Sequence, residues 1–151
     1  MKKHDFHPSI LRSYDIRGII GKTLSNSDAF AIGITFGSIL RKTGKNKIII
    51  GRDGRLTSKD LSLNLIDGLV SAGCNVINIG EGPTPMLYFA DLYFNATASI
   101  QITGSHNPSN YNGFKFILKH RSFFGENIIK LGELSSKGVN EVFGGTVEEI
   151  D

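Results

Sequence analysis

The segment from Thr103 to Lys115 holds the residues of this sequence that are best suited to chemistry. A hydroxyl, an imidazole and an ammonium are carried there by Ser105, His106 and Lys115. The Gly, Asn, Pro and Ser residues between them favour turns and cannot continue a strand. Because β-like apolar runs stand on both sides, the sequence predicts a polar loop braced by two strands, a common setting for functional sites. Composition alone also allows a loop that is merely solvated.

The chemistry of this loop is narrowed by the motifs that the sequence lacks. It has no Walker A, dinucleotide-binding, His-Glu-x-x-His or Gly-x-Ser-x-Gly pattern. Ser105 and His106 are sequence neighbours, and because adjacent side chains diverge, the imidazole is badly placed to activate the hydroxyl. The backbone N–H groups of a Gly- and Asn-rich turn can hold an anion. Phosphoryl transfer suits such a loop, since it depends mainly on positioning, cations and a metal.

Two other polar groups lie beside β-like runs. Asp15 and Arg17 are two residues apart, so an extended backbone points them to one face and Tyr14 to the other. A surface ion pair is the alternative to a functional role for them. Arg52 and Asp53 follow a short apolar run, at the strand end where open α/β sheets bind ligands. Arg52 and Asp53 could equally form a buried structural pair.

Alternating strands and helices must position these groups. Apolar runs predict strands over 13–21, 47–51, 75–80, 96–102 and 114–118. Helical spacing predicts a helix opened by Ser25-Asn-Ser-Asp, which offers several N-cap candidates, a second capped by Thr57 or Ser58, a third capped by Thr84 and a fourth over 125–137. The order predicts an α/β fold, a three-layer α/β/α domain with a mixed, mostly parallel sheet. About ten residues join the last two strands, too few for a helical crossover, so these strands should pair antiparallel or through an irregular connection.

Several residues are expected to serve packing alone. Gly33 and Gly37, four apart on the first helix, would let a neighbouring element approach closely. The aromatic Tyr88 and Phe89 of the third helix are assigned to the core. Cys74 is the single cysteine, and we expect it to be a buried small hydrophobe.

Length and composition describe one globular domain over residues 1–151, with a linker-like tail over 138–151. Hydrophobic residues make up 40% and charged residues 21% of the chain. The net charge of +3 is scattered, which suits a small anionic ligand and gives no indication of nucleic acid binding. No apolar run approaches the ~20 residues of a membrane span, and the first residues lack a signal-peptide core. We therefore expect a cytoplasmic protein.

Four motifs in order resemble those of the α-D-phosphohexomutases, in the phosphomannomutase/phosphoglucomutase branch. Thr-Gly-Ser-His-Asn-Pro and Asn-Gly-Phe-Lys, within 103–115, resemble the phosphoserine loop of this family. Tyr-Asp-Ile-Arg-Gly at 14–18 resembles its N-terminal signature. Gly-Arg-Asp-Gly-Arg at 51–55 and Gly-x-x-Pro-Thr-Pro at 80–85 also fit. The likeness runs from about residue 10 to residue 118 and is specific because the four motifs keep the family order.

The resemblance implies that Ser105 carries a phosphoryl group and passes it to a hexose phosphate. The product, a hexose 1,6-bisphosphate, would reorient and return its other phosphoryl group, and glucose 1,6-bisphosphate would act as an activator. Mg²⁺ would bind the phosphoserine oxygen and aspartates of a second domain. Lys115 and His106 would supply charge and proton transfer, and Tyr14 and Arg17 would line the site. The supporting residues would be Arg52, Asp53 and Asn107.

The family has four domains, and this chain resembles the first. The remaining domains are therefore expected partners, and the 151 residues alone should show little mutase activity. A phosphoglucosamine mutase domain is a second possibility, although the sequence at 14–18 differs from the Thr-Asp-Gly-Ile-Arg-Gly opening typical of that branch. A stand-alone sugar-phosphate-binding module is the third.

Overall fold

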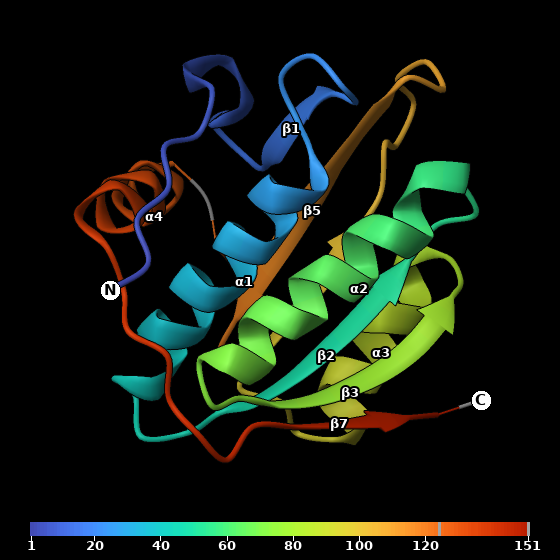
Figure 1. Ribbon diagram of the computed structural model, residues 1–151. Helices are drawn as coiled ribbons and strands as arrows, with labels where there is room; N and C mark the ends of the chain where they lie inside the picture. The colour runs from blue at the N-terminus through green and yellow to red at the C-terminus, as the bar shows by residue number, and fades with distance from the viewer. Residues whose placement is uncertain (124, 151) are drawn as a thin grey trace.

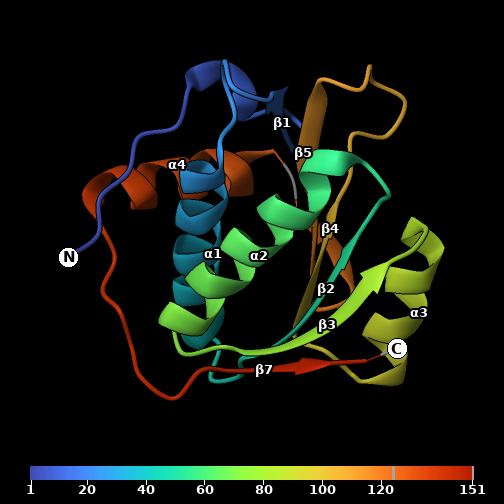
Figure 2. The same cartoon turned by 45° about the vertical axis from the view of Figure 1, so that its right-hand side comes forward.

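The chain folds into three layers, with a mixed sheet between two layers of helices (Figure 1). The computed structural model describes residues 1–123 and 125–150. One face of the sheet is covered by α1 (Asn26–Arg41), α2 (Leu56–Ser71) and α4 (Glu126–Lys137). The other face carries α3 (Thr84–Tyr93), as the turned view of Figure 2 shows. The predicted α/β/α class is thus confirmed. No helix among the described residues is long and apolar enough to cross a bilayer.

One sheet holds the strands of the described residues, in the order β1-β5-β4-β2-β3-β7, with β6 paired to β5. Their bounds are β1 (Ile16–Ile19), β2 (Lys47–Arg52), β3 (Asn75–Glu81), β4 (Ala98–Ile102), β5 (Tyr111–Leu118), β6 (Arg121–Phe123) and β7 (Thr146–Glu149). Strand β5 runs antiparallel to β1, β4 and β6, whereas β2 is parallel to β3 and β4. The antiparallel pairing of β4 with β5 confirms the expectation from their short connection. That connection is the polar loop with Ser105.

Helices α1 and α2 meet at two glycines. A Cβ atom on Gly33 would lie 2.2 Å from the carbonyl oxygen of Leu65, and one on Gly68 would lie 2.2 Å from that of Phe30. Backbone thus touches backbone at this crossing, which confirms the close approach expected at Gly33. Gly37 plays a similar part, since a Cβ there would lie 2.6 Å from that of Ala72.

The helix starts differ in part from the predictions. Ser25 caps α1 in a capping box, as expected. Helix α2 has Arg55 as its N-cap residue, without a side-chain cap, so a cap by Thr57 or Ser58 is wrong. Instead, the hydroxyl of Ser58 donates to the carboxylate of Asp53, and that of Thr57 accepts from the amide side chain of Asn112. Helix α3 begins at Thr84 itself, one residue earlier than a cap at that position would place it.

Both ends of the described chain belong to the fold. Lys2 pairs with Val139, and Ile10 is fully buried, so the N-terminal segment packs against α1 and α4. The sequence indicated a linker over 138–151, whereas residues 146–149 form β7 and extend the sheet beside β3. Polar residues dominate this exposed edge strand, so its periodicity gave no core signal.

The face of the sheet that carries α3 holds a small core. Leu87 and Ala90 are buried against the sheet, but Tyr88 and Phe89 are 50% and 69% exposed. The assignment of these two aromatic residues to the core is therefore wrong. Helical spacing cannot show whether a second helix covers the outer face of the first, and none does among the described residues. Cys74 is buried as expected, and burial raises the pKa of its thiol to about 11.

The glycine crossing yields a stability prediction. Gly33→Ala should lower the free energy of unfolding by about 1–3 kcal/mol, because backbone atoms must move to admit the methyl group. Gly132→Ala in α4 is the matched control: its nearest neighbour is Cδ1 of Leu11, at 2.6 Å, and that side chain can rotate away. Urea unfolding of both variants measures the difference. Equal losses would contradict a backbone-limited contact at Gly33.

Candidate active site

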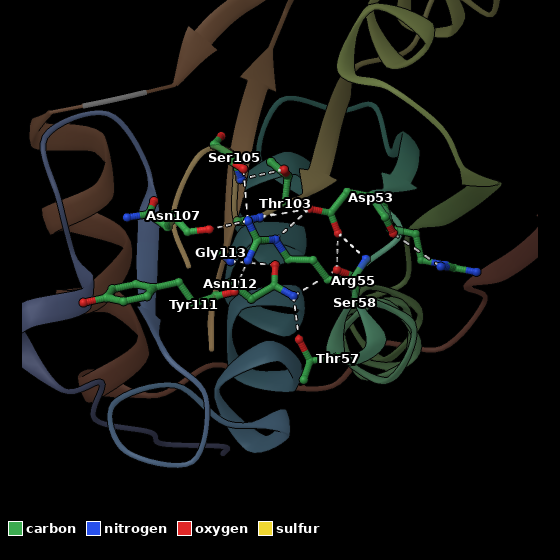
Figure 3. A network of polar contacts seen from close by, with 12 residues as sticks. Asp53, Arg55, Thr57, Ser58, Thr103, Ser105, Asn107, Tyr111, Asn112 and Gly113 are labelled. Carbon is green, nitrogen blue, oxygen red and sulfur yellow. Dashed lines mark hydrogen bonds and ion pairs between the residues drawn. The ribbon is translucent and has the colours of Figure 1, made fainter. Parts of the chain in front are cut away.

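The polar loops meet because β2 and β4 are adjacent and parallel. Arg52 and Ile102, the last residues of the two strands, are in register. The amide of Asp53 then donates to the carbonyl oxygen of Ile102 at 2.9 Å. The segment after β2 therefore lies directly beside the loop after β4, at the carboxyl edge where open α/β sheets bind ligands. Figure 3 shows the polar network that joins them.

Ser105 lies at a tight turn. Its φ angle is +51°, in the left-handed region that residues other than glycine rarely adopt. The amide of Ser105 donates to Oγ1 of Thr103 at 3.0 Å, and the amide of Asn107 donates to the carbonyl of Gly104 at 3.0 Å. Such a conformation persists where the surroundings fix it. The direction in which the half-buried side chain of Ser105 leaves the backbone is thereby fixed.

Arg17 reaches this hydroxyl from β1. Its Nη2 atom lies 3.4 Å from Oγ of Ser105 and 2.5 Å from Oδ2 of Asp15. Nη1 donates to the carbonyl of Gly104 at 3.0 Å and to Oδ1 of Asn107. Asp15 and Arg17 thus share one face as predicted, and both side chains are largely buried, so they are not a solvated surface pair. Arg17 and Asn107 both belong to the surroundings of Ser105.

The carboxylate of Asp53 is the acceptor at the centre of the network (Figure 3). It accepts hydrogen bonds from Oγ of Ser58 at 2.5 Å, from the amides of Arg55 and Gly104 at 3.1 Å, and from Nε of Arg55 at 3.3 Å. Burial raises the pKa of this carboxyl, but the hydrogen bonds from Ser58, Arg55, Gly104 and Thr103 outweigh burial, and the pKa falls below its ordinary value of 3.8. Asp53 is therefore a charged, fixed support for the loop.

Arg52 does not pair with the carboxylate of Asp53. Its Nη1 atom lies 3.5 Å from Glu81 on β3, its partner in register, and 3.4 Å from the carbonyl oxygen of Asp53. The alternative of a structural Arg52–Asp53 side-chain pair is therefore wrong, since Arg55 pairs with Asp53 instead. Arg55 belongs to the Gly-Arg-Asp-Gly-Arg motif, but the motif alone assigned it no role. Its position two residues after Asp53 was the signal, because a short turn can bring such side chains together.

Lys115 and Tyr14 face a neighbouring cavity of about 240 Å³, which Asp15 and Gln101 also line. Lys115 is half-buried on β5 and makes no ion pair with any residue in the described ranges. Because Asp15 lines the cavity and also bonds to Arg17, the cavity adjoins the surroundings of Ser105.

His106 is exposed, and no hydrogen bond joins it to Ser105 within the described chain. The structure thus agrees with the expectation that the imidazole does not activate the neighbouring hydroxyl directly.

The residues present here do not by themselves fit a magnesium site. Within residues 1–123 and 125–150, no group of three or more His, Cys, Asp or Glu side chains is placed to hold a metal ion. Mg²⁺ takes about six oxygen ligands, so a phosphate on Ser105 would supply only part of such a set.

The lowered pKa of Asp53 predicts a pH-dependent contribution to stability. Because its pKa is lower in the folded than in the unfolded state, the contribution is complete above about pH 4 and is lost as the pH falls through the folded-state value. Asp53→Asn should therefore lower the free energy of unfolding by about 1–3 kcal/mol at pH 7. Urea unfolding at several pH values should show this difference shrinking below pH 4. A difference independent of pH would contradict a charged Asp53.

Sequence comparisons identify relatives for most of the chain. Residues 8–131 match the family model described as phosphoglucomutase/phosphomannomutase, alpha/beta/alpha domain I. A phosphomannomutase/phosphoglucomutase from Pseudomonas aeruginosa is 41% identical over 95% of this chain and 31% of its own length. A phosphoglucomutase from Neisseria meningitidis serogroup B is 41% identical over 94% of this chain and 31% of its own length. The chain thus spans about a third of the length of these curated relatives.

One solved structure is similar to this chain in both fold and sequence. The crystal structure of a phosphoglucomutase/phosphomannomutase family protein from Burkholderia thailandensis aligns with a TM-score of 0.90 and 39% identity, over 97% of this chain and 34% of that one. The chain therefore belongs to the phosphoglucomutase/phosphomannomutase family and corresponds to its α/β/α domain I.

Proposed function

We propose that this chain is the phosphoryl-carrying domain of a mutase that interconverts hexose 1-phosphates and hexose 6-phosphates. The observation that carries this proposal is the hydroxyl of Ser105, held on a left-handed turn 3.4 Å from the guanidinium of Arg17. A phosphoryl group on Ser105 would lie beside the guanidinium cation of Arg17. Relatives that are named phosphomannomutase/phosphoglucomutase support the choice of hexose phosphates as substrates.

The proposed reaction transfers one phosphoryl group at a time. A free hydroxyl of the hexose phosphate attacks phosphorus, its O–P bond forms as the Oγ–P bond of Ser105 breaks, and the sugar hydroxyl gives up its proton while Oγ takes one up. The product is a hexose 1,6-bisphosphate. After this intermediate reorients, Oγ of Ser105 attacks the other phosphorus, and the same bonds and protons exchange in reverse. Positioning and fixed charges supply most of the catalysis in such transfers.

The residues around Ser105 divide this work in the proposal. Arg17 balances charge on the transferring phosphoryl group. Lys115 and Tyr14 hold the hexose phosphate in the adjacent cavity. The exposed His106 exchanges protons with the sugar hydroxyl and not with Ser105.

The rest of the enzyme is needed for turnover in this proposal. The described residues offer no group of metal ligands, so Mg²⁺ would take its further oxygen ligands from segments beyond this chain. We infer that residues 1–151 alone have little mutase activity and that the remaining domains are their partners.

Phosphorylation of Ser105 tests the proposal. Incubation of the chain with glucose 1,6-bisphosphate and Mg²⁺ should add one phosphoryl group, located on Ser105 by mass spectrometry. Ser105→Ala should abolish the addition. Ser109→Ala, an exposed hydroxyl in the same loop, is the matched control and should leave it intact.

A second arm covers the case in which the chain needs the remaining domains to react. The chain is fused to the remaining two-thirds of the Pseudomonas aeruginosa relative, and mutase turnover is measured. Turnover should fall at least about 10³-fold with Ser105→Ala, since the covalent intermediate is lost. Undiminished turnover of the Ser105→Ala fusion would overturn the proposal.

A further inference from the structure

Arg55 uses four of its five side-chain N–H donors to hold the Ser105 loop and the start of β5, and the fifth to bind Asp53. A guanidinium has five N–H groups in a planar fork. Nε donates to Asp53 at 3.3 Å. Nη1 donates to the carbonyl oxygens of Pro108 at 2.6 Å and Tyr111 at 3.2 Å. Nη2 donates to those of Ser105 at 3.0 Å and Asn107 at 2.7 Å.

This donor count separates Arg55 from the phosphate-binding cations. With its five N–H groups engaged and its side chain 17% exposed, Arg55 has no donor left for a phosphoryl oxygen. Arg17 differs, because its Nη2 atom faces the Ser105 hydroxyl. Both guanidiniums therefore bind the loop, and only that of Arg17 faces Oγ of Ser105, the oxygen that would carry the phosphoryl group.

Gly104 lets the guanidinium of Arg55 lie against the loop. A Cβ atom at this position would stand 2.3 Å from both Cζ and Nε of Arg55, well inside contact distance. The φ angle of Gly104 is not in the left-handed region, so the absence of a side chain here serves the approach of Arg55 and not a turn.

Arg55 and Asp53 together form a brace for the Ser105 loop. This brace is anchored in α2 and β5. Ser58 donates to the carboxylate of Asp53, and Nδ2 of Asn112, on β5, donates to Oγ of Ser58 and to Oγ1 of Thr57, each at 2.9 Å. Asn112 and Ser58 are fully buried. Figure 3 shows these links converging on Asp53 and Arg55. The position of the loop is thus tied to the first turn of α2.

We propose that Arg55 is a positioning residue for the phosphoryl transfer, which fixes the backbone of Ser105 and so aims its Oγ at the reacting phosphorus. The inference rests on the proposed function for its catalytic part. Lysine cannot replace Arg55, because a single ammonium has three donors and no planar fork with which to reach four carbonyl oxygens.

The structural part is tested on the chain alone by amide hydrogen exchange of Arg55→Lys, measured by NMR. The amide of Gly104 donates to the carboxylate of Asp53, and those of Asn107 and Tyr111 donate to carbonyl oxygens of the loop itself. Their exchange should accelerate at least about tenfold, while amides of the central strands β2 and β4 keep their rates. Arg121→Lys, the same substitution at an exposed site on β6, is the control and should change none of them.

The catalytic part is tested by the rate of phosphoryl uptake on Ser105 from glucose 1,6-bisphosphate, in the chain or in the fusion. Arg55→Lys should lower the maximal rate at least about tenfold, with little change in the concentration for half-maximal rate, because orientation is lost and binding is not. Gly104→Ala keeps the arginine but displaces it, and should give the same pattern. Loss of folding alone would lower the amount of reactive protein without accelerating exchange selectively in the loop.

The outcomes separate the two proposals. A wild-type protein that never accepts phosphate on Ser105, in the chain or in the fusion, would overturn the proposed function, whereas loop exchange would still test the brace. Wild-type exchange rates in both Arg55→Lys and Gly104→Ala would overturn the role of Arg55. So would phosphoryl uptake by both variants at the wild-type maximal rate.

Discussion

The parallel pairing of β2 with β4 is the constraint on which the site depends. It places Asp53 level with the first residues of the Ser105 loop, so that one carboxylate can bind the amide of Gly104 and the guanidinium of Arg55 together. Neither loop contains regular structure of its own, and each would lose much conformational entropy on ordering. Shared hydrogen bonds between the loops offset that cost, and the hydrogen bonds are possible only because the strands deliver both loops to one edge.

Features that depend on local sequence were predictable, and features that depend on pairing were not. The cap at Ser25 and the turn at Ser105 follow from residue types within a few positions. The partner of Asp53 does not, because Arg52 and Arg55 both lie within two residues of it, and only the register of β2 with β3 directs Arg52 to Glu81. Resemblance to a family identified the motif but could not distribute roles among its residues.

The same distinction explains the errors at the edges of the fold. The apolar residues of α3 predicted a helix but could not show that Tyr88 and Phe89 lack a covering layer in the described structure. Strand β7 is a polar edge strand, so its pairing with β3 left no trace in the sequence pattern. The hydroxyls of Thr57 and Ser58 are good helix caps in isolation. In the folded chain, the hydroxyl of Thr57 accepts a hydrogen bond from Asn112, which is distant in sequence. The hydroxyl of Ser58 donates to Asp53, which lies outside the helix.

The charge balance around Ser105 bears on how a phosphoryl group could be held and released. In the unphosphorylated protein, Asp15 balances Arg17 and Asp53 balances Arg55. A phosphate on Ser105 brings about −1.5 to −2 charges, and of the two guanidiniums only that of Arg17 can turn toward it. Asp15 then competes with the phosphate for Arg17, which keeps that interaction weaker than an uncontested pair. If Ser105 carries a phosphoryl group as proposed above, this limited affinity favours its transfer, because tight ground-state binding would raise the barrier.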